Sequence, residues 1–339
     1  MRGVVFLGDR QAEVRDYPDP QPGPGEVVVQ LKAGGLCGSD LHLYRQTVAQ
    51  RAGNTMIPGH EPCGVVARLG AGVTTVQVGD RVSVYHYRGC GYCKHCLGGN
   101  LMWCPDRRGY GGPIHGSDAD LILTDARNCL PLPTELSFAV GAMMACNAGT
   151  AFSSISKLRP SGADTVAIFG QGPVGLAGTL FAKAMGARVI GIDPIAERRD
   201  LARSLGADET LDPTADDPVK AIQAFTHGEG ADCAYETSGS AAGQNGAVEG
   251  LRLGGRAVFV GIGHNDKTLS PSQIIGRQLT LMGSFVLPIN MYYDMLRLIQ
   301  DQRLPLEALV THRFPIEQAP AAFTLFDSGK TGKVIFEWS

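Results

Sequence analysis

The most informative stretch of this sequence is Thr165-Val166-Ala167-Ile168-Phe169-Gly170-Gln171-Gly172-Pro173-Val174-Gly175. Its first five residues form a continuous apolar run, which is typical of a buried parallel β-strand. Gly170 suits a tight turn, Gly172 a close approach of the backbone to a pyrophosphate, and Gly175 close packing of the next helix on the strand. The free N–H groups of that helix would face the phosphates. The stretch therefore predicts a dinucleotide site, to which Pro173 and Val174 also belong.

A second predicted strand, 188–192, ends at Asp193, 18 residues after Gly175. An acidic residue at this place accepts hydrogen bonds from the adenosine ribose 2′-hydroxyl and repels a 2′-phosphate, which favours NAD over NADP. The alternative is a glycine-rich loop with Asp193 capping a turn, but two strands with a helix between them argue against it. Arg198 is a candidate contact for the adenosine, and a solvated helix arginine is an equal alternative.

Alternation of strands and helices continues beyond this motif. Apolar strands are expected at 232–236, 256–261 and 279–284, with helices near 195–206, 217–227 and 241–253. Such alternation predicts an α/β domain with a doubly wound parallel sheet, to which we assign residues 151–286.

The first 150 residues have a different pattern. Short valine-rich runs, such as 27–31 and 64–67, are separated by turns that contain glycine and proline. This pattern predicts a compact, partly closed β-barrel with long loops. After about 286, two helical segments and a last strand, 332–337, resume a mixed pattern. We infer that the chain returns to the first domain, so that 1–150 and 287–339 form one domain.

Four cysteines lie within fifteen residues, in the spacing C-x2-C-x2-C-x7-C: Cys90, Cys93, Cys96 and Cys104. Each short spacing brings two sulfurs to one side of a tight turn, and the longer one returns the last sulfur to close a tetrahedron. Four thiolates without a vacant position indicate a structural zinc that stabilises a lobe at about 88–106. A redox pair or an iron–sulfur cluster is the alternative, but a redox pair needs no third and fourth cysteine.

A second group of candidate metal ligands is Cys37-Gly38-Ser39-Asp40-Leu41-His42, followed by Gly59-His60-Glu61. Thiolate and imidazole are common zinc ligands in proteins. Here each is surrounded by groups that can orient it or move a proton. We interpret Cys37 and His60 as one half of a catalytic zinc site.

With these motifs, the chain resembles the zinc-dependent medium-chain alcohol and polyol dehydrogenases, of the medium-chain dehydrogenase/reductase superfamily, over nearly its whole length. The matching motifs are Cys37-Gly-Ser39-Asp40-x-His42, Gly59-His60-Glu61, the four-cysteine lobe, Gly79-Asp80-Arg81-Val82 and Gly170-x-Gly-Pro-Val-Gly175. The resemblance implies a GroES-like barrel as the first domain, a Rossmann domain as the second, and an active site in the cleft between them.

The resemblance also implies a third zinc ligand just before the Rossmann domain. Cys146 falls where simple alcohol dehydrogenases carry a cysteine, and Thr150 where a threonine contacts the nicotinamide end. Cys37, His60 and Cys146 would leave one position open, as is usual for a catalytic zinc, and the chain would hold two zinc ions. A buried apolar cysteine is the alternative for Cys146.

The remaining roles follow from the same resemblance. Ser39 and His42 resemble the family's hydroxyl-to-imidazole proton relay, although a surface histidine is the alternative for His42. Asp40 is expected to orient His60 through the other ring nitrogen. Glu61 is expected beside the metal, where it binds transiently.

His86 lies where family members place a substrate-pocket side chain. The other histidines are expected at the surface or in turns: His95, His115, His227, His264 and His312.

The predicted function is reversible hydride transfer between NAD and a primary or secondary alcohol, including polyols, to give an aldehyde or ketone. The opening Cys-Gly-Ser-Asp resembles the polyol and threonine branches, whereas Cys146 resembles the simple-alcohol branch. Threonine or another hydroxy acid is therefore the alternative substrate. A zinc- and nucleotide-binding homologue without turnover is a third hypothesis.

Composition excludes several classes of protein. A net charge of −3 without a basic stripe argues against nucleic-acid binding, and 44% hydrophobic residues exclude a mostly disordered chain. Neither a signal peptide nor a membrane-length apolar run is apparent, so we expect a cytoplasmic protein without a membrane partner. By analogy with the family, we expect a homo-oligomer, with a tetramer favoured over a dimer.

Overall fold

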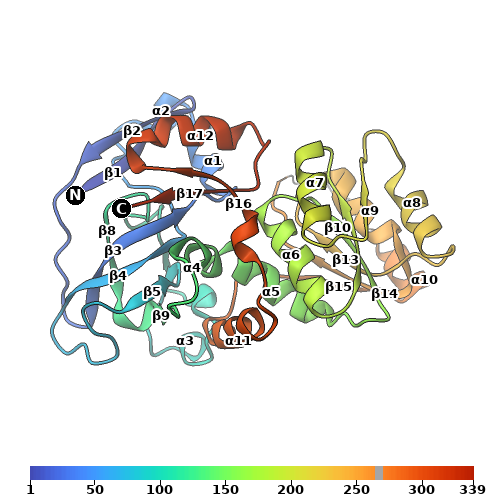
Figure 1. Ribbon diagram of the computed structural model, residues 1–339, viewed down its shortest axis with the longest axis horizontal. Helices are drawn as coiled ribbons and strands as arrows, with labels where there is room; N and C mark the ends of the chain where they lie inside the picture. The colour runs from blue at the N-terminus through green and yellow to red at the C-terminus, as the bar shows by residue number, and fades with distance from the viewer. Residues whose placement is uncertain (264–269) are drawn as a thin grey trace. The chain divides into compact units, whose positions relative to one another are not determined.

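The computed structural model describes residues 1–263 and 270–339. The chain divides into two compact units, which can be followed by residue colour in Figure 1. The first unit consists of Met1–Asn147, Pro288–Tyr292 and Val310–Ser339, and the second of Ala148–Leu287 and Tyr293–Leu309.

Six parallel strands form the sheet of the second unit, in the order β12-β11-β10-β13-β14-β15. Their bounds are β10 Thr165–Phe169, β11 Arg188–Ile192, β12 Glu209–Leu211, β13 Ala231–Glu236, β14 Leu251–Phe259 and β15 Thr280–Gly283. The chain runs outward from β10 to β12 and then crosses to β13 on the other side of β10. Ligands of such sheets bind at the carboxyl ends of the strands where the order reverses. The predicted doubly wound parallel sheet is confirmed.

Helices flank this sheet, with α6 and α7 on one side of the strands and α8 and α9 on the other (Figure 1). The helices are α5 Asn147–Leu158, α6 Pro173–Ala184, α7 Ala196–Ser204, α8 Pro218–Phe225, α9 Ala241–Glu249 and α10 Pro271–Arg277. A core that includes Phe169, Ile190 and Val248 fills the space between strands and helices. Every residue of β10 is buried, as its apolar run predicts.

The main sheet of the first unit has β3 Glu26–Gly35 at its centre. This ten-residue strand is long enough to pair with three others: β4 Pro62–Leu69, β8 Leu121–Asp125 and β17 Lys333–Glu337. The sheet is completed by β5 Arg81–Val84, β9 Cys129–Pro131 and β16 Val310–Phe314. The last strand of the chain, β17, therefore lies beside β3, and Lys333 at the start of β17 belongs to the first unit.

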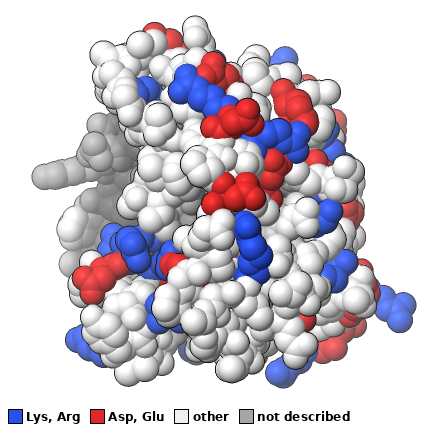
Figure 2. Space-filling view, turned by 90° about the vertical axis from the view of Figure 1, so that its left-hand side faces the viewer, with Lys and Arg blue, Asp and Glu red and all other residues white. Residues whose placement is uncertain are grey.

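Two further groups of elements complete the first unit. A hairpin of β1 Arg2–Gly8 and β2 Gln11–Asp16 packs with α12 Ala319–Asp327 around Phe6, Phe323 and Phe336. The remaining α-helices and strands are α1 Asp40–Tyr44, α2 Val48–Arg51, β6 Tyr87–Arg88, α3 Lys94–Leu97, β7 Arg108–Gly109 and α4 Phe138–Ala145, and short 3-10 helices lie at Leu101–Trp103, Ala126–Asn128 and Ile316–Gln318. On the face shown in Figure 2, acidic and basic side chains lie next to one another among neutral residues.

One expectation about the second unit is wrong. From the sequence, all of 287–339 is expected in the first domain, whereas Tyr293–Leu309 belongs to the second unit. Most of α11 Tyr292–Gln302 lies in this segment, with Met295 and Ile299 buried, and Gln302 donates a hydrogen bond to the carbonyl of Ala184 at the end of α6. An amphipathic pattern shows that one face of a helix is buried but not which unit buries it.

Candidate metal and nucleotide sites

The candidate metal ligands of the first unit meet because β3 and β4 pair antiparallel, with Gly34 opposite Pro62. Cys37 follows β3, and His60 and Glu61 precede β4, so the two loops emerge side by side. Helix α4 packs against β3, β4 and β5 and ends at Ala145, with Cys146 as its C-cap. Gly141 allows this close packing, since a Cβ atom there would lie 2.4 Å from Cys63 Sγ.

Cys37, His60, Glu61 and Cys146 each place a ligand atom within 4.8 Å of the other three. Glu61 and Cys146 are buried, and Cys37 and His60 are partly buried. The pKa of the Cys37 thiol is held well below its usual value by a hydrogen bond to Cys146 and by the charge of His60. The same hydrogen bond raises the pKa of the Cys146 thiol. Two close sulfurs, with an imidazole and a carboxylate beside them, fit the ligand chemistry of zinc.

Asp40 contacts two of these residues from α1. Its Oδ1 lies 3.1 Å from His60 Nδ1, and its Oδ2 accepts a hydrogen bond of 2.8 Å from the backbone N–H of Cys37. Burial opposes protonation of His60, but the charges of Asp40 and Cys37 raise its pKa well above the usual value. Ser39 Oγ lies 3.4 Å from His60 Nε2, the ring nitrogen that does not face Asp40. His42 is exposed on α1, and its backbone N–H donates to the carbonyl of Ser39.

Lys333 is a member of this site that was not predicted from the sequence. Its Nζ lies 2.5 Å from Glu61 Oε2, and both side chains are fully buried. Burial raises the pKa of Glu61 to about 7 while the ammonium group of Lys333 opposes that rise. For Lys333, burial lowers the pKa, but the Glu61 carboxylate outweighs it and the net shift is upward. The sequence signal that could have identified Lys333 is a lysine at the start of an apolar terminal strand, but the same pattern is typical of a surface lysine.

His86 and Asp118 are two further buried polar residues near the cluster. The Nδ1 of His86 lies 2.7 Å from the carbonyl oxygen of Ala145, and its ring centre is 5.7 Å from that of His60. Burial lowers the pKa of His86 to about 3, so the ring is neutral, donates from Nδ1 and leaves Nε2 as an acceptor. Burial, followed by the charge of Asp40, raises the pKa of Asp118 well above its usual value. Nothing in the sequence pattern distinguished Asp118.

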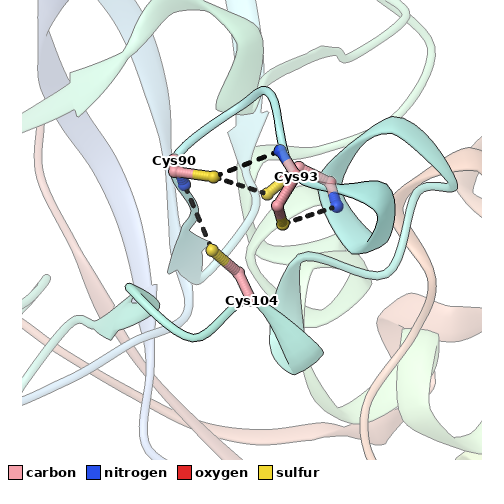
Figure 3. A group of neighbouring side chains, drawn as sticks. Cys90, Cys93 and Cys104 are labelled. Carbon is pink, nitrogen blue, oxygen red and sulfur yellow. Dashed lines mark hydrogen bonds between the residues drawn. The ribbon is translucent and has the colours of Figure 1, made fainter.

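The four cysteines of the lobe converge as their spacing predicts, and Figure 3 shows Cys90, Cys93 and Cys104 of this group. Cys90 Sγ lies 4.0 Å from Cys96 Sγ, and the backbone N–H groups of Cys90, Cys93 and Cys96 donate to cysteine sulfurs at 3.3–3.5 Å. Cys104 follows a 3-10 turn and closes the group. Four sulfurs without an oxygen or nitrogen ligand among them fit a structural zinc.

The nucleotide motif of the second unit forms a tight turn between β10 and α6. Gly170 has φ of 94°, a conformation that favours glycine. A Cβ atom at Gly175 would lie 1.9 Å from the carbonyl oxygen of Gly170, whereas Gly172 has no atom within 3.4 Å of such a position. Helix α6 begins at Pro173, followed by Val174, with Gly172 as its N-cap. The residues leave room for a pyrophosphate at the helix N-terminus.

Asp193 lies at the end of β11, beside this turn. Its carboxylate accepts hydrogen bonds from the backbone N–H groups of Gln171 and Ile195, at 2.7 and 2.8 Å. Arg198 Nη1 lies 3.7 Å from Asp193 Oδ2, and the same atom would lie 3.8 Å from a Cβ atom at Gly172. Thr150 is buried on α5 of the second unit.

The other histidines were expected at the surface or in turns, and those that the structure describes are partly or fully exposed. His95 and His312 are partly exposed, His115 and His227 are exposed, and His264 lies outside the described residues. Within 1–263 and 270–339, no single helix is long and apolar enough to cross a membrane; the bent pair of α4 and α5 passes that test only when taken together.

Comparisons with known proteins match both units. Residues 23–134 match the model of the alcohol dehydrogenase GroES-like domain, and residues 173–301 match that of zinc-binding dehydrogenases. The uncharacterized zinc-type alcohol dehydrogenase-like protein YphC of Escherichia coli K12 is 35% identical, over 100% of this chain and 99% of YphC.

Two further similar proteins are named for different substrates, one for L-threonine and the other for alcohols. The L-threonine 3-dehydrogenase of Pyrococcus horikoshii is 33% identical, over 96% of this chain and 94% of the relative. The structure of the alcohol dehydrogenase TADH from Thermus sp. ATN1 superimposes with a TM-score of 0.91 at 31% identity, over 99% of both chains. These matches confirm the predicted GroES-like and Rossmann architecture and the predicted cofactors, zinc and a nicotinamide dinucleotide. The chain belongs to the family of zinc-dependent medium-chain alcohol and polyol dehydrogenases.

Proposed function

We propose that this oxidoreductase transfers a hydride between NAD and a primary or secondary alcohol, polyols included, and gives an aldehyde or ketone. The observation that carries the proposal is the cluster of Cys37, His60 and Cys146, whose ligand atoms lie within 4.8 Å of one another. Three protein ligands are the usual set of a catalytic zinc, which keeps its fourth position for water or substrate. When bound, zinc acts as a Lewis acid that lowers the pKa of an alcohol, and NAD accepts the hydride.

The chain's own residues orient the reactants and carry the proton away. Asp40 bonds to His60 Nδ1 and to the backbone of Cys37, which fixes the positions of two ligands. The hydroxyl of Ser39, 3.4 Å from His60 Nε2, lies beside the ligand atoms, where it can take a proton from the substrate while it passes its own proton on. The exposed imidazole of His42 is suited to the solvent end of this relay.

The residues that would hold NAD are Gly170, Gly172, Pro173, Val174, Gly175, Asp193, Arg198 and Thr150. The carboxylate of Asp193 supports a preference for NAD, because it repels a 2′-phosphate. We expect Asp193→Gly to raise the use of NADP relative to NAD. The ratio of kcat/KM for the two nucleotides measures this, and an unchanged ratio would contradict the ribose assignment.

Threonine or another hydroxy acid is the second candidate substrate. The 33% identity with an L-threonine 3-dehydrogenase favours it, and the neutral Nε2 of His86 near the cluster could accept a hydrogen bond from a substrate amine or hydroxyl. Cys146 favours a simple alcohol instead, since threonine and polyol enzymes of the family usually carry a carboxylate at that position.

The test is a substrate panel with the zinc-loaded protein. Absorbance of NADH is followed with short, long and aromatic alcohols, polyols and threonine, with NAD and then with NADP. A preference for one class identifies the branch. Silence in this panel and in the reverse direction, with both zinc ions bound, would support the non-catalytic homologue. Cytoplasmic location and a tetrameric assembly stay predictions from the sequence.

A further inference from the structure

Gln171 carries the only side chain in the turn 170–172, because its two neighbours are glycines. This side chain is fully buried. Its amide Nε2 donates a hydrogen bond of 3.3 Å to the carbonyl oxygen of Ile168 in β10. Its amide Oε1 accepts a hydrogen bond of 3.0 Å from the hydroxyl of Thr179 in α6. Gln171 therefore ties the turn both to the strand before it and to the helix after it.

Thr179 lies in α6 beyond the glycine motif, which ends at Gly175. Its side chain is fully buried, so a nucleotide bound at the surface of the unit does not reach its hydroxyl. An effect of this hydroxyl on the nucleotide must therefore pass through Gln171, the group to which it donates. A change at Thr179 disturbs the turn without altering a residue that touches the nucleotide.

Gly191 in β11 makes room for the Gln171 amide. A Cβ atom at this position would lie 3.2 Å from both Cδ and Nε2 of Gln171. Gly191 pairs with Ile168 in the parallel sheet, so the strand next to Ile168 carries no side chain at the place that the amide occupies. An enclosed amide costs free energy unless its oxygen and its nitrogen both have hydrogen-bond partners. Here both are bonded, which fixes the amide in one orientation.

The backbone of Gln171 contacts the acid that is predicted to bind the ribose. Its N–H donates a hydrogen bond of 2.7 Å to Asp193 Oδ2, while the N–H of Ile195 donates to Oδ1 at 2.8 Å. Asp193 is buried, and the turn itself holds one oxygen of its carboxylate. The position of Gln171 therefore sets both the course of the pyrophosphate turn and the place of the Asp193 carboxylate.

An anchor in this turn has a physical reason. Glycine loses more conformational freedom on ordering than any other residue, and glycines flank Gln171 on both sides. Without an anchor, the turn would have to be ordered when the nucleotide binds, and the free energy of ordering would weaken the affinity. A turn that is already held in its binding conformation avoids this cost.

We propose that Gln171 and Thr179 are positioning residues: their buried hydrogen bond holds the turn 170–172, and with it Asp193, in the conformation that receives the pyrophosphate and the adenosine ribose. The proposal rests on the nucleotide site of the proposed function. It is independent of the zinc sites and of the identity of the substrate.

The test measures nucleotide affinity without turnover. NADH is titrated into the whole, zinc-loaded protein, and its fluorescence gives the Kd at a temperature at which circular dichroism shows every variant to be folded. Thr179→Val removes the hydroxyl and keeps the shape of the side chain, whereas Thr179→Ser keeps the hydroxyl. Gln171→Met removes the amide, and the double variant Gln171→Met/Thr179→Val completes a double-mutant cycle.

Thr226→Val is the matched control. It also removes a buried hydroxyl of the second unit, which donates at 2.7 Å to the carbonyl oxygen of Ile222 in α8. We expect this variant to have a lower Tm and an unchanged Kd for NADH, because its hydroxyl bonds to α8 and not to the turn.

We expect Thr179→Val to bind NADH about 3- to 10-fold more weakly than the wild type, the effect of leaving one buried hydrogen-bond acceptor unpaired. Thr179→Ser should bind as the wild type does. Gln171→Met should weaken binding by about 10-fold, since both side-chain bonds are lost. In the Gln171→Met background, Thr179→Val should cause no further loss, because its hydroxyl then has no amide to position. If Gln171→Met does not fold, Gln171→Leu takes its place in the cycle.

Three results would overturn the inference. They are wild-type affinity in Thr179→Val, an equal further loss when Thr179→Val is added to Gln171→Met, and an equal loss in Thr226→Val. Each of them, with NADH bound by the wild type, would leave the proposed function intact. Failure of the wild-type protein to bind NADH would instead overturn the nucleotide site of the proposed function together with this inference.

Discussion

The two candidate metal sites of the first unit are built in opposite ways. The four sulfurs of the lobe come from one segment, Cys90 to Cys104, and three of the four cysteines are partly exposed. The ligands of the other site come from two loops and the end of α4, and Lys333 reaches them from the last strand of the chain. A locally built site can be read from residue spacing, whereas the other site exists only after the sheet has formed.

The difference extends to what surrounds the ligands. In the lobe, mostly backbone N–H groups face the sulfurs, and the large side chains of Tyr92, Leu97 and Trp103 are exposed. Around Cys37 and Cys146, the charged side chains of Asp40, Glu61 and Lys333 are buried. A closed set of four thiolates suits a metal that holds the fold, and a surrounding of buried charges suits a metal that takes part in chemistry.

Among the substitutions that distinguish the two metal sites, loss of Cys146 should have the largest effect on turnover. Cys146→Ala removes one of three protein ligands, so we expect turnover to be abolished and one of the two zinc ions to be lost, with NAD binding retained. Zinc content by mass spectrometry and nucleotide binding by calorimetry measure the two. Cys129→Ala, at a buried cysteine outside both clusters, is the control. Unchanged zinc content and rate would show that Cys146 is not a ligand.

Loss of Cys104 should act on stability instead. Cys104→Ser removes one of the four sulfur ligands, and the lobe then loses the metal that stabilises it in place of a hydrophobic core. We expect faster hydrogen exchange of the amides between residues 88 and 106 and a lower Tm. The zinc at Cys37 should remain bound. Loss of the Cys37 zinc together with a fully protected lobe would reverse the roles that we give to the two sites.

Asp40→Asn should have the smallest of these effects. The amide keeps the size of the side chain but weakens the bonds to His60 and to the backbone of Cys37. Zinc affinity at this site should fall by about 10- to 100-fold, as is common for residues that orient a metal ligand. Competition with a chelator measures the affinity, and the lobe zinc in the same sample is the internal reference. Equal weakening of both metals would point to a general loss of stability.

The features predicted correctly from sequence are the local ones. The spacing of Cys90, Cys93, Cys96 and Cys104, and the glycine turn between two strands, depend on residues that are neighbours in the chain. The doubly wound sheet follows in the same way from the alternation of strands and helices. Such signals survive in a single sequence because the geometry that they need is set within a few residues.

The features that were missed depend on pairings between distant segments. Lys333 reaches Glu61 only because β17 lies next to β3 in the sheet, and Asp118 is buried only because its loop packs against Gly59. The assignment of α11 to the wrong domain has the same cause, since its apolar face does not specify a partner. No local periodicity encodes which segment buries a charged side chain.

A catalytic role of the Cys37 zinc can be tested by recording zinc content and NADH formation in parallel while a chelator removes metal from the wild-type protein. We expect activity with the best alcohol to fall in proportion to loss of the Cys37 zinc. Hydrogen exchange should show the lobe still protected at that stage, and added zinc should restore the rate. Activity that persists after this zinc has gone would show that the zinc at Cys37 is not the catalytic metal.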